Sequence, residues 1–123
     1  MKYTVNFKDQ PLEYRRQQNI EMRRKDPIRY LLNQVRYRCR KSGQECSVRK
    51  EDLDIPTHCP VFGIPLFFTP GKRSKNSFSL DRKDNSKGYT RENTRVISFW
   101  ANQMKGDMTI EQVEALLKYM KGN

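Results

Sequence analysis

The stretch that decides the fold is Ser79–Gly106, which reads SLDRKDNSKGYTRENTRVISFWANQMKG. The start of this stretch belongs to residues 77–81, in which apolar and polar side chains alternate. This alternation predicts a short half-buried strand. After a polar turn, the β-branched residues of TRVI at 94–97 predict a second strand. Ser98 suits the N-cap of a helix over residues 99–106. This order of strand, turn, strand and helix predicts an α+β fold built on a short antiparallel hairpin.

Two helices are predicted before this hairpin. Residues 11–26 are polar and basic, so they predict a helix with a poor hydrophobic face. Residues 27–42 predict a second helix, because Asp26 is a good N-cap, Pro27 suits the first helical position and Gly43 supplies a stop. The apolar residues of this second helix follow the spacing of one helical face: Ile28, Leu31, Leu32, Val35 and Cys39.

A last helix is predicted over residues 109–121, where Thr109 and Gln112 form a capping box. Its apolar stripe consists of Ile110, Val113, Leu116, Leu117 and Met120. We expect this stripe to pack against the core, since an isolated hairpin buries little surface and needs flanking helices. The hairpin's own core candidates are Phe78, Leu80, Val96, Ile97, Phe99 and Trp100.

These elements fit one domain over residues 1–123, the size of a typical single domain. We divide it into a basic helical arm (1–43), a ββα core (55–107) and the packing helix (109–121). The segment 50–68 is rich in Pro and Gly and is predicted to be a loop that enters the hairpin.

The chain is strongly basic. Lys and Arg number 25 against 14 for Asp and Glu, a formal net charge of +11, and the isoelectric point is about 9.8. The excess is uneven, because residues 1–50 hold 14 of the basic and 5 of the acidic residues. Such an excess is typical of nucleic-acid binding, in which Lys and Arg displace the counterions of phosphates. A nucleic acid is therefore the expected partner; a merely solvated basic surface is the alternative.

The sequence also predicts a compartment. No apolar run approaches the ~20 residues of a membrane span, and the N-terminal MKYTVNFKDQ lacks the apolar segment of a signal peptide. Three Cys do not form an even disulfide framework. These features predict a protein of the reducing cytoplasm with no membrane partner.

Oxygen-bearing side chains are placed to meet at one point. Asp81 ends the first strand and Asn102 lies on the helix that follows the second strand. A carboxylate and an amide oxygen suit Mg²⁺ or Mn²⁺, which prefer oxygen ligands and retain water. Such an ion stabilises the charge that develops on a phosphodiester during cleavage. Asn93 heads the second strand, where its amide would hold the loop that joins the strands.

The chain contains three motifs around these residues: CPVFGIPL (59–66), SLDRKDNSKGYTRENTRVIS (79–98) and ANQMKGDMT (101–109). Together they resemble small phage-type proteins of the HNH nuclease family, which has the ββα-metal fold. In that family an Asp-His pair ends the first strand, an Asn starts the second strand, and an Asn or His follows on the helix. Asp81, Asn93 and Asn102 take these places here, and the resemblance extends over residues 59–118. It implies a divalent-metal-dependent DNA endonuclease or nickase, acting in a host cytoplasm if phage-encoded. The family resemblance narrows the expected partner to double-stranded DNA.

Arg82 departs from the HNH pattern, because it stands where the family has its catalytic His. A neutral imidazole takes a proton from water near neutral pH, whereas a guanidinium ordinarily does not. Either Arg82 orients the water or clamps the phosphate and leaves activation to the metal, or the site binds DNA without cutting it. The resembling phage group itself carries Arg here, which favours a working variant.

Several of these residues have simpler interpretations. Asp81 and Asp84 are also common turn formers, and Tyr89 suits loop packing. The candidate DNA contacts could equally be solvated cations: Arg36, Arg38, Arg40, Lys41, Lys87, Arg91, Arg95 and Lys105.

Zinc is common in HNH proteins on paired Cys-x-x-Cys motifs, which this chain lacks. A Cys₃His site is conceivable from Cys39, Cys46, His58 and Cys59, but the spacing is irregular and Cys39 lies on an apolar helix face. We therefore expect no structural zinc.

Three functions remain open from the sequence. The first is a metal-dependent nuclease, favoured by the Asp81/Asn93/Asn102 spacing. The second is a non-catalytic DNA-binding protein on a decayed nuclease fold, favoured by Arg82. The third is an interaction module whose basic face binds an acidic protein.

Overall fold

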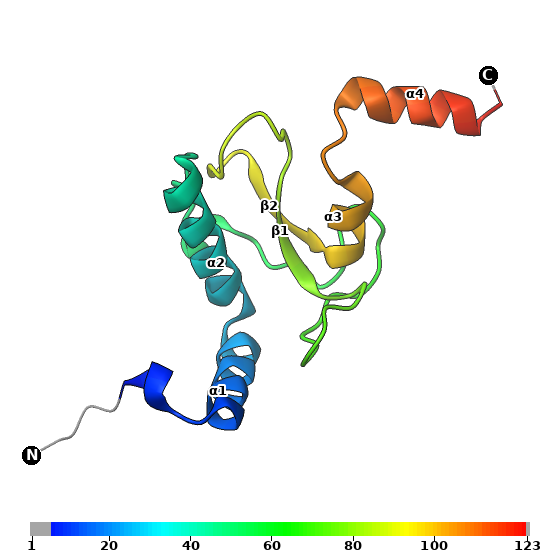
Figure 1. Cartoon of the computed structure of the whole chain (residues 1–123). Coiled ribbons are helices and arrows are strands. Elements are labelled where there is room, and N and C mark those ends of the chain that lie inside the picture. The colour runs from blue at the N-terminus through cyan, green and yellow to red at the C-terminus, as the bar shows by residue number, and fades with distance from the viewer. Residues whose placement is uncertain (1–5, 123) are drawn as a thin grey trace, which may run out of the picture.

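The structure, a computed structural model, describes residues 6–122 and has the predicted α+β class. Its helices are α1 (Leu12–Lys25), α2 (Pro27–Ser42), α3 (Phe99–Lys105) and α4 (Ile110–Met120), with short 3₁₀ turns at Phe7–Asp9 and Lys50–Asp52. Its strands are β1 (Phe78–Arg82) and β2 (Thr94–Ser98). The helices and strands predicted from sequence are all present, with ends shifted by a residue or two (Figure 1).

The two strands form an antiparallel hairpin. Phe78 pairs with Ser98 at one end and Arg82 with Thr94 at the other, so Leu80 lies opposite Val96. In this register the side chains of Leu80 and Val96 share one face of the sheet, and those of Ser79 and Ile97 share the other. Two different layers can therefore pack on the hairpin.

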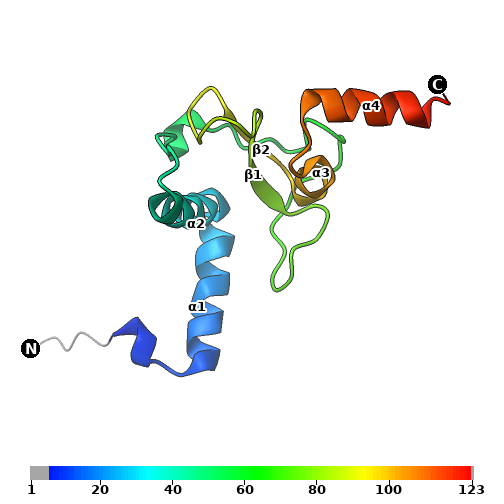
Figure 2. The same cartoon turned by 45° about the horizontal axis from the view of Figure 1, so that its top comes forward.

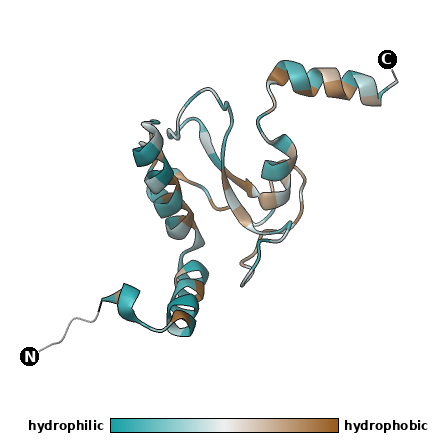
Figure 3. Cartoon of the chain, in the orientation of Figure 1, coloured by the Kyte–Doolittle hydropathy of each residue, from teal (hydrophilic) through white to brown (hydrophobic). Residues whose placement is uncertain are grey.

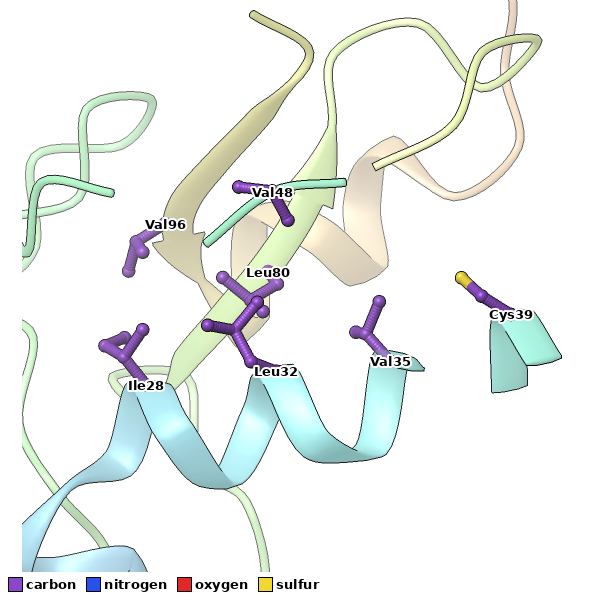
Figure 4. Packing of buried hydrophobic residues seen from close by; sticks show 7 residues of the cluster. All are labelled: Ile28, Leu32, Val35, Cys39, Val48, Leu80 and Val96. Atoms are coloured by element: carbon purple, nitrogen blue, oxygen red, sulfur yellow. The ribbon is translucent and has the colours of Figure 1, made fainter. Parts of the chain in front are cut away.

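Helix α2 covers the first face. Its start is fixed by Asp26, whose side chain accepts a hydrogen bond from the Arg29 amide at 3.1 Å, and its end by Gly43 at φ 74°. The predicted apolar face turns onto the hairpin, as Figure 4 shows. This main core consists of Ile28, Leu32, Val35, Cys39, Val48, Leu80 and Val96.

Helix α3 covers the second face. Ser98 is its N-cap and accepts a hydrogen bond from the Ala101 amide at 3.0 Å. The segment around Cys59 closes this side, because the Cys59 sulfur accepts a hydrogen bond from the Ser98 amide at 3.3 Å. A smaller core results from Cys59, Leu66, Ile97 and Ala101.

The prediction that β1 is half-buried is wrong. Ser79 is 5% exposed and Asp81 is 8% exposed, although both lie on the polar side of the alternating pattern. The reason is that α3 packs over that side and supplies polar partners, which a pattern of hydropathy alone does not register.

The expected basic arm over 1–43 divides into two parts. Helix α2 belongs to the core, whereas α1 has no buried residue and extends from the start of α2 (Figures 1 and 2). Residues 1–5 lie outside the described part of the chain.

The expected packing of the last helix is wrong. Helix α4 forms with its capping box, but none of its described residues is buried, and it projects away from the hairpin. Its apolar positions, which give this helix its brown segments in Figure 3, are therefore exposed.

The layering predicts which leucines matter for stability. Leu32→Ala, at a residue 1% exposed between α2 and the hairpin, should lower the free energy of unfolding by about 2–5 kcal/mol through lost burial and a cavity. Leu12→Ala, at a residue 51% exposed on α1, should change it by less than about 0.5 kcal/mol. Urea unfolding of both variants measures this, and equal losses would contradict the assigned core.

Candidate functional site

A polar cavity of about 250 Å³ lies along β1, between α2 and the C-terminal end of α3. Asp81 and Arg82 reach it from β1, Asn102 from α3 and Arg38 from α2. Arg73, from the loop that precedes β1, lines it as well. The cavity, called the cleft below, thus gathers three of the four predicted catalytic residues. Its lining includes three guanidinium groups, the buried carboxylate of Asp81 and the exposed carboxylate of Asp107.

Asp81 is the buried acid of the cleft. Its side chain points to the α3 side of β1, where Lys105 Nζ donates a hydrogen bond to Oδ1 at 3.1 Å. Burial raises the pKa of Asp81 above its ordinary value of 3.8, and the ammonium of Lys105 partly opposes that rise. Ionisation of this carboxyl group is therefore unfavourable, and any further cation that enters the cleft would stabilise its charged form.

Lys105 closes the end of the hairpin. Besides Asp81, it donates to the backbone oxygen of Arg82 at 2.7 Å and to Asn85 Oδ1 at 2.9 Å. These three acceptors match the three donors of an ammonium group. The side chain of Lys105 is therefore bound within the protein and fixes β1 to α3 and the loop. That it also contacts DNA stays a prediction.

Asn102 is oriented by two acceptors on β1. Its Nδ2 donates to Ser79 Oγ at 2.6 Å and to the backbone oxygen of Leu80 at 3.3 Å. A backbone carbonyl only accepts, so the amide nitrogen must face β1 and the Oδ1 atom must face away from it. Among the described residues, no side chain or backbone group donates to Asn102 Oδ1 or to Asp81 Oδ2.

The donor set of the cleft fits a hard divalent cation. It offers carboxylate and amide oxygens, which suit Mg²⁺ and Mn²⁺ better than softer metals. Within residues 6–122 there is no cluster of three His, Cys, Asp or Glu side chains. A metal in the cleft would therefore keep several waters, as Mg²⁺ usually does.

Asn93 holds the loop between the strands, as expected from its position. It is 7% exposed, and its Oδ1 accepts from the Asp84 amide at 2.9 Å. Its Nδ2 donates to the backbone oxygens of Asp84 at 3.0 Å and Gly88 at 2.9 Å. Asn93 is thus a positioning residue that does not line the cleft.

Asp84 forms a turn. Its Oδ1 accepts from the Ser86 amide at 2.9 Å and from Ser86 Oγ at 2.6 Å, and these bonds lower the pKa of Asp84. Tyr89 packs against the main core, so its predicted role in loop packing is confirmed.

Arg82 folds back over its own loop. Its Nη1 donates to the backbone oxygen of Lys87 at 3.2 Å, and its guanidinium lies 5.2 Å from the centre of the Tyr89 ring. A guanidinium has five donors, so further donors remain for a ligand in the cleft. These donors suit binding of an anion, and because the guanidinium stays protonated it does not suit removal of a proton.

The other predicted DNA contacts lie on several surfaces. Arg38 lines the cleft, whereas Arg36 lies on another side of α2 and donates to the backbone oxygen of Val48 at 3.4 Å. Arg91 and Arg95 line a separate depression, with Asp52 and Asp54. The remaining three, Arg40, Lys41 and Lys87, are exposed. Arg38 is therefore the predicted contact that best fits a ligand in the cleft.

Arg73 was missed by sequence reasoning. It occurs in a basic turn, TPGKRSKN, whose three closely spaced cations were the available signal. The signal does not single out Arg73, because only the folded loop brings this side chain, rather than Lys72 or Lys75, to the cleft.

The four possible zinc ligands are not brought together. Cys39 and Cys46 meet beside the main core, Cys59 lies in the smaller core, and His58 is exposed with its Nδ1 3.0 Å from Thr57 Oγ1.

Comparison with protein-family models, curated proteins and solved structures gives no match for this chain. In the described residues, no helix combines the length and apolar composition needed to cross a bilayer. The case for a function therefore depends on the chemistry of the cleft.

The raised pKa of Asp81 predicts a pH effect on stability. The folded state binds the proton of the Asp81 carboxyl group more tightly than the unfolded chain does. Protonation of Asp81 therefore stabilises the fold fully below about pH 3.8, and this stabilisation is lost as pH rises through the pKa of the folded state. Asp81→Asn removes the titration. The difference in free energy of unfolding, Asp81→Asn minus the unmodified protein, should therefore rise as pH increases through that range.

Asp84→Asn is the matched control with the opposite sign. The pKa of Asp84 is lowered, so its stabilisation is present above the ordinary carboxyl pKa and is lost as pH falls through the folded value. Relative to the unmodified protein, this variant should lose stability as pH rises. Urea titrations between about pH 3 and pH 7 at constant ionic strength measure both differences; parallel curves for the two variants would contradict the assignment.

Proposed function

We propose that this protein is a divalent-metal-dependent DNA endonuclease or nickase, a variant of the HNH family with Arg82 in place of the catalytic His. The observation that supports it is the convergence of Asp81 and Asn102, from a strand and a facing helix, in a cleft lined by Arg38, Arg73 and Arg82. Paired oxygen donors suit a metal, and guanidinium groups suit a phosphodiester. The net charge of +11 suits a polyanionic substrate.

Asp81 and Asn102 would hold Mg²⁺ or Mn²⁺. When bound, the ion supplies Lewis-acid stabilisation of the charge that develops on the phosphodiester. Lys105 balances the charge of Asp81, and the hydrogen bonds from Asn102 Nδ2 to β1 keep its oxygen turned away from the strand. Asn93 holds the loop from which Arg82 receives its backbone partner.

Arg82 acts as an anion clamp in this proposal. Its guanidinium stays protonated at every relevant pH and does not serve as a general base. Its remaining donors can bind a phosphate oxygen with the planar geometry that favours arginine over lysine at such sites. Arg38 and Arg73, on the other walls of the cleft, would bind the flanking phosphates of the same strand.

A second function, DNA binding without cleavage, is favoured by one specific observation. The Asp81 carboxylate already has a cationic partner, because Lys105 donates to it at 3.1 Å. An ammonium at this position satisfies the acid without a metal, so the cleft could bind DNA as a purely basic groove. The two functions share the DNA and differ in the need for a metal.

Cleavage of supercoiled plasmid separates the two functions. With Mg²⁺ or Mn²⁺, Asp81→Asn should reduce nicking to the level seen with EDTA, because it removes the charged ligand. Asn102→Ala should reduce it by at least about 10-fold, the lower end of the loss when groups that support metal ligands are removed. The loss should be less complete than in Asp81→Asn, because a neutral amide contributes less charge than a carboxylate. Asp54→Asn, an exposed acid outside the cleft, is the control and should nick at the unmodified rate.

Arg82 variants complete this experiment. If Arg82 clamps phosphate, Arg82→Ala should lose activity and Arg82→Lys should retain a small part, since lysine lacks the planar fork. If the site is decayed, the unmodified protein should match Asp81→Asn, and Arg82→His should create or raise cleavage by restoring an imidazole base. Equal rates for the unmodified protein and Asp81→Asn would leave DNA binding as the function.

Binding to duplex DNA should weaken steeply with salt, with a slope of about 0.9 per phosphate contact. Deleting residues 1–25 removes seven basic and three acidic residues but keeps the Asp26 cap, so the slope should become shallower. Deleting residues 109–123 is the matched control, because α4 is equally unburied and this segment has two basic and two acidic residues. Fluorescence anisotropy with a labelled duplex measures all three slopes; an unchanged slope without residues 1–25 would exclude α1 from the DNA contact.

A further inference from the structure

A second cavity, of about 80 Å³, opens between the start of α2 and the loop that precedes β1. Four aromatic residues line it: Tyr30, Phe67, Phe68 and Phe78. Two arginines, Arg23 from α1 and Arg73 from the loop, line it as well. The cavity, called the aromatic pocket below, therefore combines ring faces and edges with positive charge.

The arginines of the aromatic pocket lack acidic partners. Among the described residues, no carboxylate lies within ion-pair distance of Arg23 or Arg73. The same is true of Arg24, which does not line the pocket but lies over its residue Phe68. Each guanidinium instead lies over a ring, Arg23 over Tyr30 at 5.5 Å, Arg24 over Phe68 at 5.6 Å and Arg73 over Phe99 at 5.4 Å. The Arg23 Nε atom is buried with no hydrogen-bond partner in the described structure. An anionic or acceptor-rich ligand would satisfy these donors.

The wall formed by the loop is held in shape by its own hydrogen bonds. The Phe67 amide donates to the backbone oxygen of Asn76 at 3.1 Å, and Asn76 Nδ2 donates to the backbone oxygen of Pro65 at 2.8 Å. Thr69 Oγ1 and Ser77 Oγ lie 2.6 Å apart, and the Ser74 amide donates to Ser77 Oγ at 2.9 Å. The aromatic pocket is thus formed before any ligand arrives, which lowers the entropic cost of binding.

The aromatic pocket and the cleft are neighbours. Leu31 and Arg73 line both cavities, and β1 leads from Phe78 in the pocket to Asp81 in the cleft. In the proposed function, a DNA strand with a phosphate in the cleft would have its neighbouring nucleotide within reach of the pocket, because the two cavities share these lining residues. Arg73, which reaches both, is placed to bind the phosphate that joins the two.

We infer that the aromatic pocket binds an unpaired nucleobase of the DNA strand held in the cleft, an inference that rests on the proposed function. Bases stack on aromatic rings without regard to sequence, and arginine adds cation–π attraction. The pocket is too small for a helix or a folded segment. The unpaired guanidinium groups favour a nucleotide over an apolar peptide side chain. The protein then acts preferentially on DNA with an unpaired or displaced base beside the scissile phosphate.

The test uses the full chain in Ca²⁺ with two labelled DNAs, one fully paired and one with a single unpaired 2-aminopurine. The unmodified protein should bind the second about tenfold more tightly and change the fluorescence of the base by stacking. Phe67→Ala, at a residue 48% exposed in the pocket, should lose that preference and the fluorescence change. Its affinity for the fully paired DNA should stay the same.

Phe62→Ala is the matched control, because Phe62 is 43% exposed and stacks on Trp100 outside the pocket. It should keep the preference. If the unmodified protein binds both DNAs with equal affinity, the proposed role of the pocket is overturned and the proposed function stands. The same holds if Phe62→Ala and Phe67→Ala lose the preference for the unpaired base equally. Failure to bind either DNA would overturn both proposals.

Discussion

A two-stranded hairpin does not bury enough surface to fold alone, and the rest of the structure depends on how this one is covered. Helix α2 packs on the face that presents Leu80 and Val96, and α3 packs on the face that presents Ser79 and Ile97. The two layers meet β1 from opposite sides, and the cleft lies along β1 between the middle of α2 and the C-terminal end of α3. The packing of α2 and α3 on the two faces of the hairpin therefore determines both the fold and the position of the cleft.

The electrostatics of the cleft follow from the same layering. Because α3 covers the polar side of β1, Asp81 is buried and its pKa is raised. A buried carboxylate requires compensation, and Lys105 supplies it while fixing Arg82 and Asn85 by their oxygens. In a chain of net charge +11, a buried acid in a cavity that arginines also line is the group that most distinguishes this surface from a plain basic one.

The proposed nuclease site and the aromatic pocket are neighbours on one surface, and each has its own proposed function. In the proposal, the cleft holds the metal and the phosphate, and the pocket selects DNA with a base free to leave the stack. Arg73 belongs to both and would couple recognition to cleavage. Helix α4 takes no part in either, since none of its described residues lines the cleft or the pocket; Asp107, which lines the cleft, precedes the helix.

The sequence by itself determined the local elements. Asp26, Ser98 and Thr109 cap their helices as expected, and the spacing from Ile28 to Cys39 defined the buried face of α2. It also predicted that Asp81 and Asn102 lie together, and both line the cleft. It identified Asn93 as the residue that holds the loop, because strand order and spacing are local properties. Only the tertiary structure decided that Lys105 is bound to Asp81, that Arg73 reaches the cleft, and that α4 stays uncovered. These outcomes depend on contacts between segments far apart in the chain, and hydropathy and spacing along the sequence carry no record of such contacts.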